Sequence, residues 1–357
     1  MRMRIPSSGP LHAPGRQSGV ALVLALLVVA LVTAISVELS WRFDLGMTRA
    51  ANRWYGVQAD AYLRGAEEFA FMALRYDQDE DRENGKPVDK LGEVWAQPPQ
   101  QFPVDEGWIR GGLEDAQGRF NINLLQNSID KKVAAKLTCA QPERYTENQR
   151  RFIRLLQTIE VEEDTFIDQY TAMNITAAII DWIDIDSVVT CEGAESDYYS
   201  QLEPPFVIPN KAMVSVSELN VIQGITPVIY QKLLPLVIAL PPEATLNVNT
   251  MPLQLLRTIA SKDSLYPNSE DDAQYIYEER GGGYDDLEGF KSSAAVDQVV
   301  GSNAQGSLLD LTGLGVASSY FIFNGDAMVG DYVRERRALI HRDDQEIKVL
   351  RRTDANF

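Results

Sequence analysis

An uncharged apolar stretch near the N-terminus constrains this chain more than any other feature. Residues Val20 to Val37 include no charged side chain, and only Thr33 and Ser36 among them are polar. As a helix with a rise of 1.5 Å per residue, such a stretch extends roughly 27 Å, close to the ~30 Å hydrocarbon core of a bilayer. The sequence therefore predicts one transmembrane helix, at residues 20–40.

The charges before this span predict its orientation. Arg2, Arg4 and Arg16 precede it, and no acidic residue does. Positively charged flanks stay in the cytoplasm, so we expect the rest of the chain on the opposite side of the membrane.

Two kinds of leader fit this arrangement. A cleaved signal peptide has an apolar region of 7 to 15 residues followed by a small-x-small site, for which Ala34 to Ser36 is a candidate. The second is a type IV prepilin leader, which the Gly19-Val20 junction resembles: residues 1–19 would be removed after Gly19 and the apolar helix retained. Most pilin-type subunits carry a glutamate as the fifth mature residue, and here that position is Leu24.

The overall charge excludes some partners. The chain has 33 Lys and Arg against 51 Asp and Glu, a formal net charge of -18 at pH 7. Nucleic acid and anionic lipid surfaces are poor partners for such a protein.

The two cysteines, Cys139 and Cys191, both follow the predicted span. An oxidising compartment would pair them as a disulfide, worth about 4 kcal/mol by loop-closure entropy. The alternative is two buried free thiols.

The pattern beyond the span predicts a long helix and then two kinds of structure. The helix continues without proline from Val20 to Arg75, and the acidic stretch Asp77 to Gly85 is expected to end it as a loop. Helical periodicity dominates from about Asn127 to Leu240. Strand-like segments surround this block, at Trp108–Arg110 (before a Gly111-Gly112 break), Gly118–Leu125, Ser319–Phe323, Ala327–Val333, Ala338–His341 and Glu346–Leu350.

These elements predict an α+β fold with a pilin-like long N-terminal helix on an antiparallel sheet and a large inserted, mainly α-helical domain. We expect the head at 41–126 and 246–357 and the inserted domain at 127–245.

Acidic residues gather inside this helical block. Between Arg154 and Lys211 there is no basic residue, and the segment includes five acids that we expect to form a cation site: Asp181, Asp184, Asp186, Glu195 and Asp197. Asp181 and Asp184 would share one face of a helix, and the following loop would return the others beside them. Oxygen ligands suit hard divalent cations, calcium above all, although the EF-hand spacing is absent. The alternative is a solvated acidic face.

The remaining motifs give weaker predictions. Ser217 to Leu233, with Gly224 at its centre, resembles a degenerate helix-hairpin-helix segment, which leaves open a membrane-tethered, DNA-uptake-like binding protein. The acidic neighbours of this hairpin offer little to phosphate. No nucleophile, Walker or Rossmann motif is present, and His341 is the only histidine outside the leader, so we expect no enzyme and no catalytic residue.

Nearly the whole chain resembles one family, the minor pseudopilin K of type II secretion systems (GspK, general secretion pathway protein K). The matching segments are Gly19-Val20 with Leu24, Gly118–Asn123, Ala178–Asp186, Gly193–Tyr198, Ser217–Leu219 and Leu246–Thr250.

This resemblance implies a single-pass protein of the bacterial inner membrane with its bulk in the periplasm, processed by prepilin peptidase. It further implies two bound calcium ions and a complex with minor pseudopilins I and J at the tip of the periplasmic pseudopilus, where assembly for protein export across the outer membrane begins.

Overall fold

The computed structural model describes residues 18–304 and 306–354. The chain divides into two compact units, Met1–Gln58 and Ala59–Phe357, and helix α1 (Ser18–Asn84) passes from the first into the second. Within the described part of the chain, this is the one helix long and apolar enough to cross a membrane. The remaining predicted leader, 1–17, lies outside the described residues.

The predicted end of α1 was wrong. The helix continues through Asp77 to Asn84, and Gly85 ends it with a left-handed φ of 71°. Acidic residues near a helix C-terminus destabilise the helix. In this last part of α1, however, two side chains bond residues that are distant in sequence. Gln78 donates to Asp343 O at 2.8 Å, and Arg82 donates to Asp344 O at 2.6 Å. Tertiary contacts therefore extend the helix by more than two turns.

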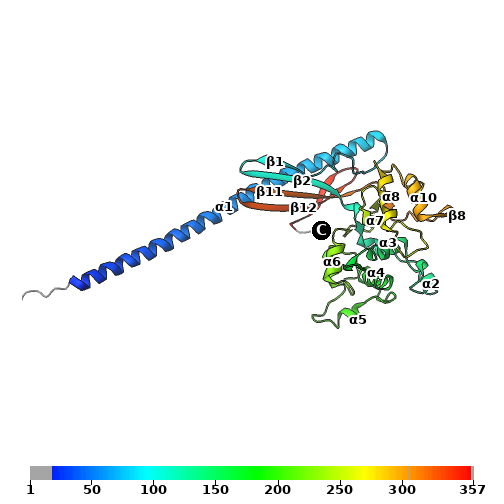
Figure 1. Ribbon diagram of the computed structural model, residues 1–357, viewed down its shortest axis with the longest axis horizontal. Coiled ribbons are helices and arrows are strands. Elements are labelled where there is room, and N and C mark those ends of the chain that lie inside the picture. Colours follow the sequence, from blue (N-terminus) through cyan, green and yellow to red (C-terminus); the bar gives the residue numbers. More distant parts are fainter. Residues whose placement is uncertain (1–17, 305, 355–357) are drawn as a thin grey trace, which may run out of the picture. The chain divides into compact units, whose positions relative to one another are not determined.

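The head is an antiparallel sheet in the order β1-β2-β11-β12-β13 (Figure 1). Its strands are β1 (Gln100–Val104), β2 (Gly107–Asp115), β11 (Tyr320–Val329), β12 (Tyr332–Arg342) and β13 (Ile347–Thr353). Strands β2 and β11 pair directly, with Phe321 opposite Asp115 and Val329 opposite Gly107. Every residue between them in sequence, from Ala116 to Ser319, therefore connects two neighbouring strands.

The second half of α1 packs on one face of this sheet. Ala70 and Leu74 of the helix share a buried cluster with Phe321, Phe323 and Ala338 of the sheet. Gly325 permits this close approach, because a Cβ there would lie 3.1 Å from Leu63 Cδ2 and 2.6 Å from the ring of Phe323. Ion pairs Asp60–Arg336 and Glu67–Arg352 flank the apolar contact.

The other face of the sheet carries the helical domain, joined by a small cluster that includes Ile238, Leu240, Tyr320 and Leu339. Its main helices are α3 (Glu147–Leu156), α4 (Gln169–Ile183), α6 (Pro227–Leu233), α8 (Glu270–Arg280) and α10 (Ala294–Val300), and its shorter ones are α2 (Lys131–Ala134), α5 (Ser196–Tyr199), α7 (Leu253–Leu256) and α9 (Leu287–Lys291). One large apolar core extends from Phe120 to Leu314. Helices thus continue well past residue 245, where the sequence placed the second part of the head.

Short 3₁₀ helices and two-residue strands complete the helical domain. The 3₁₀ helices are η1 (Ala116–Gly118), η2 (Ile122–Gln126), η3 (Pro142–Arg144) and η4 (Val216–Val221). The strands are β3 (Phe120–Asn121), β4 (Glu160–Glu162), β5 (Thr165–Phe166), β6 (Val237–Ile238), β7 (Leu246–Asn247), β8 (Ser302–Asn303), β9 (Gly306–Ser307) and β10 (Leu314–Gly315).

An Asn-x-Asn motif occurs twice in this domain with the same local geometry. Asn121 and Asn247 each end a short strand that pairs in parallel with a later one, β3 with β6 and β7 with β10. Each accepts, through Oδ1, the backbone N–H two residues on, from Asn123 at 3.2 Å and from Asn249 at 3.0 Å. The side chains of Asn123 and Asn249 in turn bridge to distant backbone, at Met213 and Tyr284. The motif bends the chain out of the strand.

That bend explains one wrong strand prediction. The alternation from Gly118 to Leu125 predicted a strand, but only Phe120 and Asn121 pair, and Ile122–Gln126 is a 3₁₀ helix. The predicted break at Gly111-Gly112 was also wrong. Strand β2 continues through both glycines. Position 112 needs a glycine because a Cβ there would lie 2.7 Å from Pro99 Cγ.

Candidate metal centre

The five acids predicted from the sequence, named the loop acids here, begin at the end of α4. Asp181 lies in the last turn of that helix and is fully buried. Asp184 is the C-cap residue, with φ −79° and ψ 169°, and its N–H donates to Ile180 O at 2.9 Å. Asp184 is thus the residue at which the chain leaves the helix, three positions after Asp181, and its charge acts on Asp181.

Asp181 has one satisfied and one unsatisfied carboxylate oxygen. Its Oδ1 accepts a hydrogen bond from Thr190 N at 2.9 Å, whereas its buried Oδ2 has no hydrogen-bond partner. Burial, together with the nearby charges of Glu195 and Asp184, raises the pKa of Asp181 to about 7. An ionised carboxylate that is buried without a partner needs a counter-charge.

Glu195, at the other end of the loop, likewise has one satisfied and one unsatisfied carboxylate oxygen. It is the N-cap of α5, is 5% exposed, and its Oε2 accepts from Ser196 N at 3.4 Å. Its Oε1 is buried and has no hydrogen-bond partner. Burial raises the pKa of Glu195, and the charges of Asp186 and Asp197 add to this effect.

Asp181 thus interacts electrostatically with Glu195 and Asp184, and Glu195 does so with Asp186 and Asp197. The structure does not gather three of their oxygens as tightly as a metal requires: within the described ranges, such a group, with ligand atoms within 4.8 Å of one another, occurs at Asp77, Asp89 and Glu93. Asp184 and Asp186 also line a pocket of about 520 Å³ with Thr190 and Arg144. Two orphaned buried oxygens beside further carboxylates fit a hard cation with oxygen ligands.

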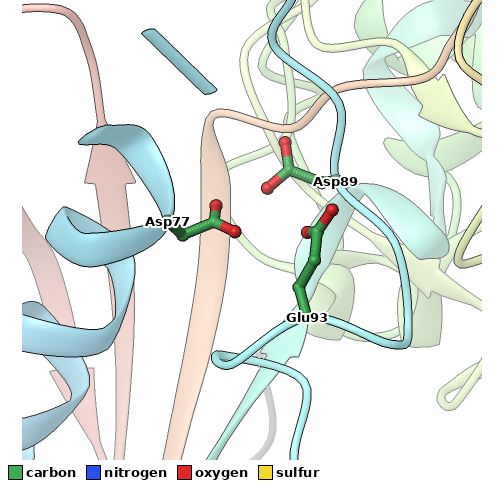
Figure 2. A group of neighbouring side chains, drawn as sticks. All are labelled: Asp77, Asp89 and Glu93. Atoms are coloured by element: carbon green, nitrogen blue, oxygen red, sulfur yellow. The ribbon is translucent and has the colours of Figure 1, made fainter. Parts of the chain in front are cut away.

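The second acidic group, named the head acids here, was missed by the sequence analysis. Asp77 comes from α1, and Asp89 and Glu93 come from the segment after it (Figure 2). Burial raises the pKa of Asp89 to about 8 and that of Glu93 to about 7. No local pattern joins these residues, because Asp77 and Asp89 meet at Arg342 of β12, which is 265 and 253 positions away from them.

Arg342 gives the head acids an internal counter-charge. Its guanidinium donates to Asp77 Oδ2 at 2.6 Å and to Asp89 Oδ1 and Oδ2 at 2.6 and 2.8 Å. Glu93 accepts from Trp95 Nε1 at 2.8 Å and from Lys90 N at 2.9 Å. The group therefore has the spacing of a metal site but is already neutralised in part by the protein, and the loop acids remain the better candidate.

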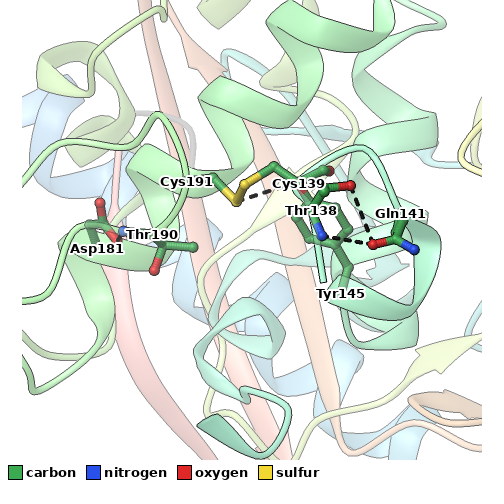
Figure 3. Close-up of a disulfide and its surroundings, with 7 residues drawn as sticks. All are labelled: Thr138, Cys139, Gln141, Tyr145, Asp181, Thr190 and Cys191. Atoms are coloured by element: carbon green, nitrogen blue, oxygen red, sulfur yellow. Dashed lines mark hydrogen bonds between the residues drawn. A yellow bond between two sulfur atoms is a disulfide. The ribbon is translucent and has the colours of Figure 1, made fainter. Parts of the chain in front are cut away.

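A disulfide closes the loop that carries the loop acids. Cys139 and Cys191 are joined with an S–S distance of 2.02 Å across a sequence separation of 52 residues, which confirms the predicted pairing (Figure 3). Tyr145 lies beside it and donates to Cys139 O at 2.8 Å. The loop is thus tied to the segment that leads into α3.

Comparison with known proteins identifies the family. The family model described as "Type II secretion system (T2SS), protein K" matches residues 118–242. Type II secretion system protein K of Aeromonas hydrophila is 33% identical to the chain, with 94% of this chain and 97% of that protein covered. The protein of the same name from Pseudomonas aeruginosa is 32% identical, with coverage of 94% and 92%.

The chain belongs to the type II secretion system protein K family. A solved structure agrees: a chain of the GspK-GspI-GspJ complex from enterotoxigenic Escherichia coli matches with a TM-score of 0.69 and 26% identity, covering 85% of this chain and 98% of that chain. The fold class and the minor pseudopilin function predicted from the sequence are confirmed.

As a member of the protein K family, the chain is a structural subunit. His341 packs against the ring of Tyr320, with ring centroids 4.8 Å apart, and its Nδ1 lies 3.8 Å from Asp343. Gly19 and Val20 lie in the first turn of α1. The family assignment leaves the loop acids as the part of the molecule with unexplained chemistry.

Proposed function

We propose that this protein is the tip subunit of the periplasmic pseudopilus and that it initiates assembly together with minor pseudopilins I and J. The observation that carries this proposal is the likeness, over 85% of this chain, to a chain solved in a GspK-GspI-GspJ complex. The subunit acts by assembly and has no catalytic role.

Leu24 supports a position at the end of the assembly. In a stack of pilin-like subunits, a glutamate in the apolar helix is costly unless it is paired, and its natural partner is the charged N-terminus of the next subunit. A terminal subunit has no such neighbour. An apolar residue at position 24 is therefore the expected choice there.

The insertion between β2 and β11 supports the same position. It adds a helical domain with its own apolar core to the face of the sheet opposite α1. A domain of that size would hinder another subunit from packing above, whereas a tip has no subunit to accommodate.

The tip position is tested by counting copies. Isolated pseudopili labelled at this subunit should carry one label at one end, and the subunit should co-purify with I and J but form no homopolymer. The Leu24→Glu variant should assemble normally. Labels repeated along the fibre would contradict the proposal, and a mobility shift with DNA at low salt would favour the helix-hairpin-helix alternative.

The proposed membrane topology rests on α1. Prepilin peptidase cleaves between Gly19 and Val20, the apolar helix stays as a single inner-membrane anchor, and the domain after it is periplasmic. The uninterrupted apolar stretch directly after Gly19 supports this processing. Mass spectrometry of the mature N-terminus should find Val20 first, and a mature protein that starts after Ser36 would restore the signal peptide.

The loop acids are proposed to bind calcium. Asp181, Asp184, Asp186, Glu195 and Asp197 would hold the ion, and the orphaned oxygens of Asp181 and Glu195 support this assignment. A bound cation would supply the positive charge that the segment between Arg154 and Lys211 lacks. Because an ion bound only to the folded state stabilises it, calcium should raise the melting temperature and a chelator should lower it. Equal melting temperatures would favour a solvated acidic face.

A further inference from the structure

The position of the Asp181 carboxylate depends on a loop with little regular structure. Between the end of α4 and Glu195 the chain has no helix or strand. Thr190 N is the group that holds Asp181 Oδ1, at 2.9 Å, and Thr190 O accepts from Gly193 N at 2.8 Å. Displacing the turn from Thr190 to Gly193 would therefore release Asp181.

The disulfide is the covalent anchor of that turn. Cys191 follows Thr190 directly and has a φ of 51°, in the left-handed region that non-glycine residues seldom adopt. Its sulfur is bonded to Cys139, whose carbonyl accepts from the hydroxyl of the buried Tyr145. Figure 3 shows this sequence of contacts, from Tyr145 through the disulfide to Thr190 and Asp181.

Gly193 fixes the other side of the same carboxylate. A Cβ at this position would lie 2.2 Å from Asp181 Oδ2 and 2.9 Å from the carbonyl carbon of Ala177. Glycine therefore allows the loop to lie directly against the oxygen that has no hydrogen-bond partner. Any side chain would push either the loop or the carboxylate away.

We propose that the Cys139–Cys191 disulfide and Gly193 are positioning residues of the calcium site, so that the oxidation state of the cysteines sets the affinity for calcium. The proposal rests on the proposed function of the loop acids. Without the disulfide, the turn would lose its covalent connection to the segment before α3. The mutual repulsion of the loop acids would then act against a turn that is held by hydrogen bonds alone.

Thermodynamic linkage gives this proposal a second observable. If the oxidised protein binds calcium more tightly by some factor, calcium must favour the disulfide over the two thiols by the same factor. Reduction by a dithiol transfers two electrons and two protons to the sulfurs, and the dithiol becomes a cyclic disulfide. Calcium should therefore protect the bond against dithiothreitol in the folded, oxidised protein.

The first experiment measures calcium binding by titration calorimetry on the full chain in detergent micelles. We expect the Cys139→Ser/Cys191→Ser double variant to bind calcium about tenfold or more weakly than the oxidised wild type. Circular dichroism monitors whether the variant is folded. In case it is not, the wild type itself is equilibrated in dithiothreitol redox buffers with and without calcium, and the fraction of disulfide is read by thiol alkylation.

The second experiment separates crowding at the site from the mere loss of a glycine. Gly193→Ala should weaken calcium binding with the disulfide intact, whereas Gly282→Ala should not, because a Cβ at 282 meets nothing within 4 Å.

Three outcomes are decisive. Weaker binding in the double variant and in Gly193→Ala, with calcium protecting the bond, supports the proposal. If the wild type binds calcium and all variants bind it equally, the positioning role is overturned and the calcium function stands. If the oxidised wild type binds no calcium, both fall.

Discussion

The head acids and the loop acids are two buried groups of carboxylates, and they differ in where the compensating charge comes from. Arg342 lies between Asp77 and Asp89 and makes hydrogen bonds of 2.6 to 2.8 Å to both. The segment that carries the loop acids has no basic residue between Arg154 and Lys211. The buried oxygens Asp181 Oδ2 and Glu195 Oε1 have no hydrogen-bond partner. A tight spacing of acids alone therefore does not identify a metal site; the missing counter-charge is the more telling observation.

The largest expected effect is the loss of the internal counter-charge. Arg342→Met would leave two buried carboxylates, Asp77 and Asp89, beside the partly buried Glu93, and breaking a buried ion pair in this way costs about 3–5 kcal/mol of unfolding free energy. Urea unfolding measures it, and calcium should not restore the loss. Lys348→Met, which removes an exposed pair with Glu346, is the control and should change stability little, because solvent screens that pair. Similar losses in both variants would contradict the assigned role of Arg342.

Removal of calcium should come next in size. At a free calcium concentration 100 to 1,000 times the dissociation constant, binding contributes about 2.7 to 4.1 kcal/mol, which a chelator abolishes. Asp181→Asn should lose this contribution, yet in chelator it should be as stable as wild type or more so, because the buried charge has gone. Destabilisation by Asp181→Asn in both conditions would mean that the carboxylate has a partner other than the cation.

The head acids should also make stability depend on pH. Burial raises the pKa of Glu93 from 4.5 to about 7. Because the folded-state pKa exceeds the unfolded one, the contribution is fully present below pH 4.5 and is lost as pH rises through 7, an effect of about 1 kcal/mol after allowance for partial exposure. Melting curves in chelator from pH 5 to 8 should show this fall, and Glu93→Gln should make it shallower while the parts due to Asp89 and Asp181 remain. A rise in stability between pH 5 and 8 would contradict the raised pKa assigned to Glu93.

The smallest change of unfolding free energy in chelator is expected at Asp184, which is only partly buried and lines the pocket. Asp184→Asn should weaken calcium binding by about one order of magnitude, as loss of one charged ligand does, while stability in chelator stays within about 0.5 kcal/mol of wild type. Calorimetry and thermal melts together test this. An unchanged affinity would remove Asp184 from the proposed ligand set.

What could be predicted from the sequence follows the range of the interactions involved. The apolar start of α1 and the loop acids lie within short windows, so composition and spacing were enough to find them. The end of α1 and the head acids could not be found, because Asp77 is held by Arg342, 265 positions away. Asn121 misled for a local reason: its side chain captures the N–H of Asn123 and bends a stretch whose alternation had predicted a strand.

The helical domain lies within one connection of the sheet, the one between the neighbouring strands β2 and β11. Strands β2 and β11 are antiparallel neighbours, and a turn of a few residues could join Asp115 to Tyr320. Gln117 fastens the two ends of the connection, because its side chain donates to Thr245 O at 2.8 Å and accepts from Ser319 N at 2.6 Å.

Closing so long a connection costs about 3–4 kcal/mol more than closing a tight turn. The central strand pair of the head can therefore form cheaply only after the helical domain has folded and brought its ends together. A subunit whose helical domain is unfolded would bear this closure cost in full, and its sheet would be a less stable surface for a partner.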